Sequence, residues 1–166
     1  MFIKDGDKSF YGFPCEYAFA WGWVGCEVKN TNSWKSNFER QSFIDKFNSI
    51  TNDGMNPDYK RRGTKGIHYC EMCKEPLGNA QITISHGGIL YNSPNAVLHY
   101  VYHHGYCPPS EVIDAVMNGV FLKEKDLMHT ANDWMVHGDS ERVANSVLKR
   151  AILKGLVKYG KSNFIN

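Results

Sequence analysis

The sequence predicts an α+β fold: a small zinc-stabilised module, made of a β-knuckle, a hairpin and a helix, followed by helices and preceded by an aromatic segment. Three observations predict it. A Cys-x-x-Cys pair at Cys70 and Cys73 precedes alternating, β-branched residues that are typical of strands. Histidines then recur at helical spacing, and beyond Pro109 so do apolar residues. The expected regions are 1–66, 67–109 and 110–166, within one compact domain.

Length, charge and hydropathy narrow the class of protein. The chain has 166 residues and a net charge of +2, which gives no argument for nucleic acid or an anionic membrane as a partner. It has no run of about 20 apolar residues and no signal-peptide features at its N-terminus, so we expect no membrane association. The five cysteines include a close pair with histidines downstream, which favours a metal site in a reducing, cytoplasmic compartment over disulfides.

The first part of the chain, residues 10–28, is aromatic and interrupted by glycines. Its aromatic side chains alternate in part with small ones, which favours β-strands. A short helix over residues 14–21, with Pro14 at its first position, is the alternative. We expect most of these aromatic side chains to pack in the core. A stacking or ligand-binding surface is the second interpretation.

A helix and a linker are expected next. Ser33 follows a cluster of turn-forming residues and is predicted to cap a helix over residues 34–49, where large apolar residues recur at roughly helical spacing. The Asn-Asp-Gly sequence at 52–54 ends this helix. The polar stretch 55–66 is typical of a linker or exposed loop.

The central module is predicted to contain a knuckle, a hairpin and a helix. Gly78 permits the chain to turn back after the cysteine pair. Asn92 or Ser93 is expected to cap the helix, and Gly105 ends it. The expected elements are a strand at 67–69, the knuckle at 70–78, a strand at 80–84, a turn at 86–88, a strand at 89–91 and a helix at 94–104.

Two thiolates and two imidazoles at this spacing are the ligand set of a closed tetrahedral zinc site. Cys70 and Cys73 supply the thiolates, and His99 supplies one imidazole. The fourth ligand is His103 or His104, since a residue four positions on shares a helix face and one five positions on reaches it when the last turn loosens. The predicted cofactor is therefore a structural Zn²⁺.

Other side chains near this set are weaker candidates. Cys107 is a substitute ligand of low rank, because two prolines fix the backbone after it. His68 and His86 are more typical of polar surface. The gap from Cys73 to His99 is longer than in the short DNA-reading fingers, so we do not expect their DNA-binding geometry.

Beyond Pro109 the chain is predicted to be helical. Ser110 caps a helix that starts at Glu111, a second helix spans 121–136, and a third begins after the Asp-Ser pair at 139–140. Basic side chains in the loop and on the last helix are either solvated or a surface for nucleic acid or an acidic partner. The candidate surface residues are Lys60, Arg61, Arg62, Lys149, Arg150 and Lys154.

Residues 69–116 resemble a group of small, largely uncharacterised bacterial and phage C2H2-like zinc-binding proteins. The shared pattern is a Cys-x-x-Cys-x-x-x-Leu-Gly knuckle, a His-Tyr-Val-x-x-His helix and a Tyr-x-Pro-Pro sequence before an acidic residue and an apolar helix. The residues that match are Cys70, Cys73, Leu77, Gly78, His99, Tyr100, Val101, His104, Tyr106, Pro108, Pro109 and Glu111. The resemblance implies a zinc-stabilised fold, with His104 as the fourth ligand, and no agreed activity.

The leading functional hypothesis is a non-catalytic zinc-binding protein. Four protein ligands leave the zinc no open position, which is typical of structural sites. Such a module would bind another macromolecule, protein or nucleic acid, for example as a phage or bacterial regulator. We therefore lean towards a protein that is not an enzyme.

Two other hypotheses have a different chemistry. In a metal-dependent hydrolase or nuclease, three ligands and a water would hold the metal, with Glu71, Glu75 or His103 as the base. His86 is the candidate catalytic histidine of a finger-type nuclease, but the sequence shows no acidic neighbour for it. Alternatively, the N-terminal aromatic region forms a ligand-binding or enzymatic pocket, with zinc only structural. The leading candidates for residues of this pocket are Glu16, Tyr17 and Trp21.

Overall fold

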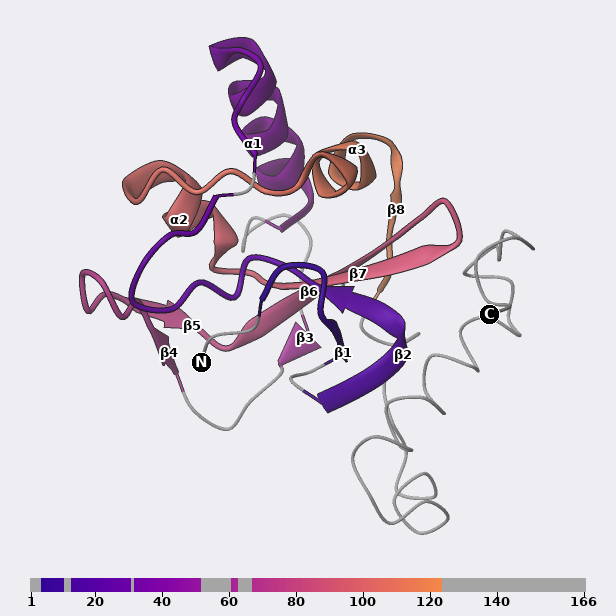
Figure 1. The fold of residues 1–166 in the computed structure, drawn as a ribbon, viewed down its shortest axis with the longest axis horizontal. Coiled ribbons are helices and arrows are strands. Elements are labelled where there is room, and N and C mark those ends of the chain that lie inside the picture. The colour runs from indigo at the N-terminus through magenta and orange to yellow at the C-terminus, as the bar shows by residue number, and fades with distance from the viewer. Residues whose placement is uncertain (1–3, 11–12, 31, 52–60, 63–66, 124–166) are drawn as a thin grey trace, which may run out of the picture.

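The computed structural model describes residues 4–10, 13–30, 32–51, 61–62 and 67–123 of the chain (Figure 1). Within them the fold is α+β, as the sequence predicts: a mixed sheet, a separate small hairpin and three helices. Figure 1 shows the helices gathered above β6 and β7. No helix in these ranges is long and apolar enough to cross a bilayer.

The main sheet is built around one antiparallel hairpin, β6 and β7. β2 adds to the β7 side in parallel, and β1 pairs with β2. On the other side, β3 and β8 both pair with β6. The strands are β1 (Lys8–Phe10), β2 (Phe13–Ala20), β3 (Arg61–Arg62), β6 (Ala80–His86), β7 (Ile89–Pro94) and β8 (Val120–Phe121).

A second, two-stranded sheet carries the cysteine pair. It consists of β4 (His68–Tyr69) and β5 (Pro76–Gly78), and the knuckle lies between them. The three helices are α1 (Asn37–Thr51), α2 (Val97–His103) and α3 (Ser110–Asn118). Because β4 and β5 are only two and three residues long, this hairpin needs support from other parts of the fold.

Aromatic side chains fill the centre of the core, which agrees with the first interpretation of the aromatic segment for Trp21. The Trp21 ring meets Phe43 and Phe47 of α1 edge to face, with centroids 6.3 and 6.1 Å apart. Phe47 in turn meets Phe121 of β8 at 6.1 Å. These contacts tie the end of β2 to α1 and to the sheet.

The structure decides the conformation of the aromatic segment in favour of a strand. Residues 13–20 form β2, and its last three residues pair with β7. Pairing with β7 stabilises this strand. An isolated helix of the same length would be only marginally stable. The side chains of Glu16 and Tyr17 lie outside the described residues.

The first helix begins later than predicted, so the prediction of Ser33 as its cap is wrong. α1 starts at Asn37, and the Ser36 hydroxyl accepts a hydrogen bond from the Glu39 backbone N–H at 3.1 Å. The Glu39 carboxylate accepts the Lys35 N–H at 2.8 Å. This reciprocal arrangement resembles a capping box, which satisfies more backbone donors than a lone serine does.

The boundary between β7 and α2 was also predicted wrongly. Asn92 and Ser93 do not cap the helix, because β7 continues through Pro94 and α2 starts only at Val97. Both side chains are buried, and the Asn92 amide donates to the Ile82 carbonyl at 3.3 Å and the Thr83 hydroxyl at 3.2 Å. The sheet thus pairs the buried Asn92 amide inside the fold.

Predictions for the flanking regions have mixed outcomes. The helix after Pro109 is confirmed as α3, but it begins at Ser110, so the prediction of Ser110 as its cap is wrong. Phe121 lies in β8 rather than at the start of a helix, because it pairs with Ile84 of β6. Arg61 and Arg62 form β3 within the predicted linker. The rest of the linker and the last two predicted helices lie outside the described residues, apart from residues 121–123.

Candidate metal centre

The knuckle holds the two cysteines of the pair on a tight turn. The Cys70 N–H donates to the Glu75 carbonyl at 2.8 Å, and the Lys74 N–H donates to the Cys70 carbonyl at 2.8 Å. Lys74 has a φ of +67°, a left-handed conformation that non-glycine residues adopt rarely and that closes the turn. Cys70 is buried while Cys73 is exposed, so the site lies at the surface with one ligand anchored in the core.

Helix α2 supplies the histidines from its first turn and its end. His99 lies in the helix, whereas His104 follows its last residue with φ −125° and ψ 9°. The His104 N–H still donates to the Tyr100 carbonyl at 3.1 Å. Gly105 then adopts a φ of +66°, which ends the helix in the manner predicted. The opened last turn is what allows residues five apart to face one point.

The structure brings together four ligand atoms, from Cys70, Cys73, His99 and His104, all within 4.8 Å of one another. The Cys70 Sγ lies 3.3 Å from the His104 Nε2, and the Cys73 Sγ lies 3.3 Å from the His99 Nε2. The two Nε2 atoms are 3.1 Å apart. These residues lie close enough to hold a metal ion.

Three edges of this cluster are close to those of a tetrahedral site. Metal bonds of about 2.3 Å to sulfur and 2.0–2.1 Å to nitrogen give S···N edges of about 3.6 Å and an N···N edge of about 3.3 Å. The observed separations of 3.3 and 3.1 Å are a few tenths of an ångström shorter. These three edges therefore need only a small expansion to accommodate an ion.

Glu75 orients one of the histidines from outside the cluster. Its Oε2 lies 3.1 Å from the His99 Nδ1, opposite the nitrogen that faces the thiols. An N–H donated from Nδ1 to this carboxylate leaves the Nε2 lone pair free for a metal. The sequence named Glu75 only as a candidate base, and the structure gives it this supporting position instead.

The crowding of these side chains shifts the pKa values of His99 and Cys73. Burial lowers the pKa of His99 and the nearby His104 lowers it further, while Glu75 opposes them, so the net shift favours the neutral imidazole. At Cys73 the Glu75 backbone N–H lowers the pKa, but burial and the adjacent Cys70 outweigh it and the net shift is upward. Two thiols this close resist joint ionisation unless a cation compensates their charge.

The weaker ligand candidates lie outside the cluster. His103 is exposed, and its ring centroid lies 5.0 Å from that of His99. Cys107 is buried, its Sγ lies 3.6 Å from the Pro108 carbonyl, and burial raises the pKa of its thiol to about 11. His68 uses its Nε2 in a 3.0 Å hydrogen bond with the Tyr100 hydroxyl. Of the two alternatives left open by spacing, His104 is the one that joins the cluster.

The expectation that His86 lacks an acidic neighbour is wrong. Its Nε2 lies 2.8 Å from the Asp114 Oδ2 of α3, and the Asn118 amide donates to the other carboxylate oxygen at 2.6 Å. Helix α3 brings this carboxylate close across 28 residues of sequence. His86 ends β6, at the opposite end from the knuckle, so this pair is not part of the metal cluster.

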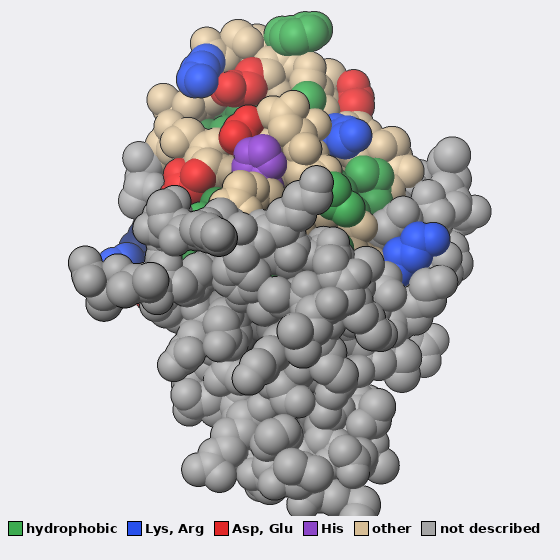
Figure 2. Space-filling view, turned by 90° about the vertical axis from the view of Figure 1, so that its right-hand side faces the viewer, with side chains coloured by type: hydrophobic (Ala, Val, Ile, Leu, Met, Phe, Trp, Pro, Cys, Tyr) green, Lys and Arg blue, Asp and Glu red, His purple; other side chains and the backbone are tan. Residues whose placement is uncertain are grey.

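The predicted basic surface falls largely outside the described residues. This is the case for Lys60, Lys149, Arg150 and Lys154, while Arg61 and Arg62 are described only as the backbone of β3. On the face shown in Figure 2, the Lys and Arg side chains of the described residues are scattered, and a histidine lies among acidic side chains. The described part of this face thus carries no concentrated positive patch.

Comparisons with known proteins place the chain in a family without supplying a function. A search of curated proteins found no match, and a search of solved structures found none either. A family model described as "Domain of unknown function (DUF7919)" matches residues 1–117, which include all four residues of the metal cluster and span more than half of the chain. The chain therefore belongs to the DUF7919 family.

Proposed function

We propose that this chain is a non-catalytic zinc-binding protein whose metal stabilises a module that binds another macromolecule. The observation that carries the proposal is the convergence of four ligand atoms within 4.8 Å, from two thiols and two imidazoles. A tetrahedral S₂N₂ donor set favours zinc over the harder cations, which prefer oxygen ligands. The thiols must stay reduced, so we place the protein in a reducing compartment such as the cytoplasm.

The closed ligand set supports a structural role. A catalytic zinc keeps one position open for water, whereas here a protein atom is available for each of the four positions. Glu75, a candidate base, faces the His99 Nδ1 rather than a water position. The His86–Asp114 pair lies at the end of β6 away from the knuckle and outside the cluster, so it places no catalytic base beside the metal, and we do not advance the hydrolase or nuclease hypothesis.

The metal would act by joining two weak elements. The short β4–β5 hairpin carries the thiols, and the end of α2 carries the imidazoles. Cross-linking them through one ion would contribute on the order of 10 kcal/mol of apparent binding energy to the folded state. The end of α2 would then be held in one fixed position relative to the knuckle.

Exposed apolar side chains support a role in macromolecular binding. Ile67 is 58% exposed and Tyr69 is 54% exposed, both beside the knuckle, and Tyr102 of α2 is 47% exposed. Exposed aromatic residues are enriched in protein interfaces and also stack on nucleic-acid bases. They lie in or next to the elements that carry the ligands, so the metal would fix their positions. We propose this as the partner-binding surface, for a protein or a nucleic acid.

The first experiment is elemental analysis of the purified protein with thermal melts before and after chelator. We expect one zinc per chain, loss of zinc in Cys73→Ser, and a lower Tm in that variant. Cys26→Ser is the matched control, because Cys26 is a free, exposed thiol outside the cluster. Folded protein purified without metal, or a Cys73→Ser variant that retains zinc, would contradict the zinc assignment.

The partner class is tested separately with the zinc-loaded protein. Fluorescence anisotropy with random-sequence DNA and RNA, single- and double-stranded, is measured at low and high salt. A nucleic-acid partner predicts binding that weakens with salt and is reduced in Tyr69→Ala. Absence of binding to all four probes would exclude general nucleic-acid affinity and leave a protein partner as the hypothesis to pursue.

A further inference from the structure

The backbone after helix α2 decides which of two neighbouring histidines joins the metal cluster. His103 follows His99 by four positions, the spacing that places two side chains on one face of a regular helix. His104 follows the last helical residue, and it is His104 that lies in the cluster. The contacts that fix the chain just after His104 therefore also fix the ligand set.

Asn30 holds the chain at this point with both ends of its side-chain amide. Its Nδ2 donates to the Gly105 carbonyl at 2.9 Å, and its Oδ1 accepts the Cys107 backbone N–H at 2.8 Å. An amide side chain offers a donor and an acceptor, so one residue can hold a segment at two points. We call these two hydrogen bonds the Asn30 bridge. It spans 75 residues of sequence and begins at the residue directly after His104.

The turn that the Asn30 bridge holds has little support from α2 alone. The Tyr100 carbonyl accepts both the His104 N–H at 3.1 Å and the Tyr106 N–H at 3.0 Å, so one acceptor serves two donors. The helix is seven residues long, and helices of this length are marginally stable in isolation. Contacts from outside α2 therefore determine where the helix ends and which residue follows it.

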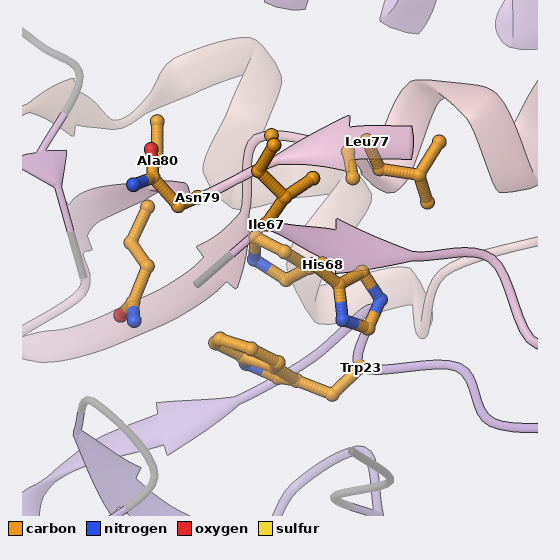
Figure 3. A pocket seen from close by; sticks show the side chains of 10 residues that line it. Trp23, Ile67, His68, Leu77, Asn79 and Ala80 are labelled. Atoms are coloured by element: carbon orange, nitrogen blue, oxygen red, sulfur yellow. The ribbon is translucent and has the colours of Figure 1, made fainter. Parts of the chain in front are cut away.

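The thiol half of the site is less suited to make this choice. A pocket of about 250 Å³ lies between the β4–β5 hairpin and the start of β6. Figure 3 shows the Trp23 indole across this pocket from Ile67 and His68. Open space provides no atoms for the hairpin to pack against, so this side of it is held less tightly than a filled core would hold it. The thiols thus have room to follow either histidine.

We propose that Asn30 is a positioning residue that selects His104 over His103 as the fourth metal ligand. By holding residues 105–107, the Asn30 bridge ends α2 at His103 and presents His104 to the cluster. This inference rests on the proposed zinc site and adds to it a residue of the N-terminal region that is not itself a ligand. A bridge that served only stability would not affect which histidine binds.

The test identifies the metal-bound imidazoles in zinc-loaded, ¹⁵N-labelled full-length protein. Long-range ¹H–¹⁵N spectra distinguish ring nitrogens that bind zinc from those that do not. We expect His99 and His104 to be the bound pair in the wild type, and His103 to replace His104 in part of the Asn30→Ala sample. Competition with a chelator should show a roughly tenfold loss of zinc affinity in Asn30→Ala, the low end of the effect of a supporting residue on a metal site.

Asn32→Ala is the matched control. The Asn32 Nδ2 donates to the Pro108 carbonyl at 3.2 Å, so this variant also removes a hydrogen bond to the segment after α2, but farther from His104. It should keep the wild-type ligand pair and zinc affinity.

His103→Ala gives a second readout that a purely structural role would not change. In the wild type it should leave zinc affinity unchanged, whereas in the Asn30→Ala background it should lower the affinity further, because His103 becomes a ligand there. If Asn30→Ala does not fold, hydrogen exchange of the wild type decides instead. Coupling between two sites is reciprocal, so zinc should slow exchange at the Cys107 amide, which donates to Asn30. Exchange unaffected by zinc would contradict the proposal.

A folded Asn30→Ala variant in which His104 remains the sole fourth ligand would overturn the proposal, whatever its zinc affinity. Zinc bound by His103 in the wild type would also overturn it and leave the proposed zinc-binding function intact. A wild type without zinc would overturn both, and the elemental analysis described above identifies that case. Failure of this inference and failure of the proposed function are thus distinguishable.

Discussion

At the scale of single residues, Glu75 is the side chain whose role changed most once the fold was known. It follows Cys73 by two positions, and the sequence offered it as a base because it is acidic and near the predicted metal. Its position against the His99 Nδ1 instead makes it an orienting group. Spacing along the chain predicted which cysteines and histidines come together, but it does not reveal which way a carboxylate turns.

Glu75→Gln is therefore expected to weaken metal binding without abolishing it. Loss of a carboxylate partner of a ligating histidine typically costs 10- to 100-fold in metal affinity. Competition with a chromophoric chelator gives the affinity of the wild type and the variant. Glu71→Gln, on the same knuckle, is the matched control and should stay near the wild-type value. An unchanged affinity for Glu75→Gln would remove Glu75 from the metal centre.

Asp5 is a second residue whose environment makes a prediction. Its carboxylate accepts the Tyr106 hydroxyl at 2.7 Å and the Gly22 N–H at 2.8 Å. Burial raises the pKa of Asp5 more than these two hydrogen bonds lower it. The folded state therefore binds the proton more tightly than the unfolded chain, and stability from this group is full at low pH and falls as pH rises through the folded pKa.

Comparison with Asp5→Asn, which does not titrate, isolates this effect. The free energy of unfolding of the wild type minus that of the variant should decrease as pH rises above about 4, the ordinary carboxyl range. Urea unfolding at a series of pH values, with chelator present in both samples so that metal release does not contribute, measures the difference. A difference that grows with pH would mean that the Asp5 pKa is lowered rather than raised.

At the scale of elements, the approach of the chain after β2 to helix α2 depends on one glycine. Gly22 has a φ of +71°, and a Cβ there would lie 2.6 Å from the Val97 Cγ2. Gly22→Ala therefore combines left-handed strain with overpacking and should cost about 2–4 kcal/mol. Gly6→Ala shares the positive φ, +87°, but has open space around the added Cβ, so it should cost about 1–2 kcal/mol.

Chemical denaturation of both variants measures this contrast. Equal destabilisation by Gly22→Ala and Gly6→Ala would show that α2 shifts to accept the methyl group and that the close approach is not required. The metal affinity of Gly22→Ala is a second measurement of any shift in α2, because α2 carries His99.

Element types were easier to predict than element boundaries. The alternation at residues 80–84 predicted β6, and the spacing of the histidines predicted a helix that became α2. The start of that helix was placed too early because Asn92 has the chemistry of a cap, yet its amide bonds to Ile82 and Thr83 inside the sheet. A polar side chain such as that of Asn92 can hydrogen-bond within a sheet or cap a helix, and its tertiary neighbours determine which of the two it does.

At the scale of the whole molecule, the arrangement of the strands was beyond the reach of the sequence. β2 pairs in parallel with β7, some 70 residues further along, and this joins the aromatic region to the metal module. No local pattern specifies which strands become neighbours. Each half of the cluster was predictable because Cys70 and Cys73, and likewise His99 and His104, are close in sequence, whereas the pocket beside Trp23 arises from segments far apart in sequence.

Metal removal is expected to open one part of the molecule before the rest. The strands of the β4–β5 hairpin are only two and three residues long, whereas Ile82, Ile84 and Leu90 of the longer β6–β7 hairpin are buried. Hydrogen exchange with and without chelator should show loss of protection at the Cys70 and His104 amides, which donate to Glu75 and Tyr100. The β6–β7 amides should stay protected.

Cys26→Ser should behave as the wild type does, since Cys26 lies outside the cluster. Equal loss of protection in β6 and β7 would instead mean that the metal supports the entire domain.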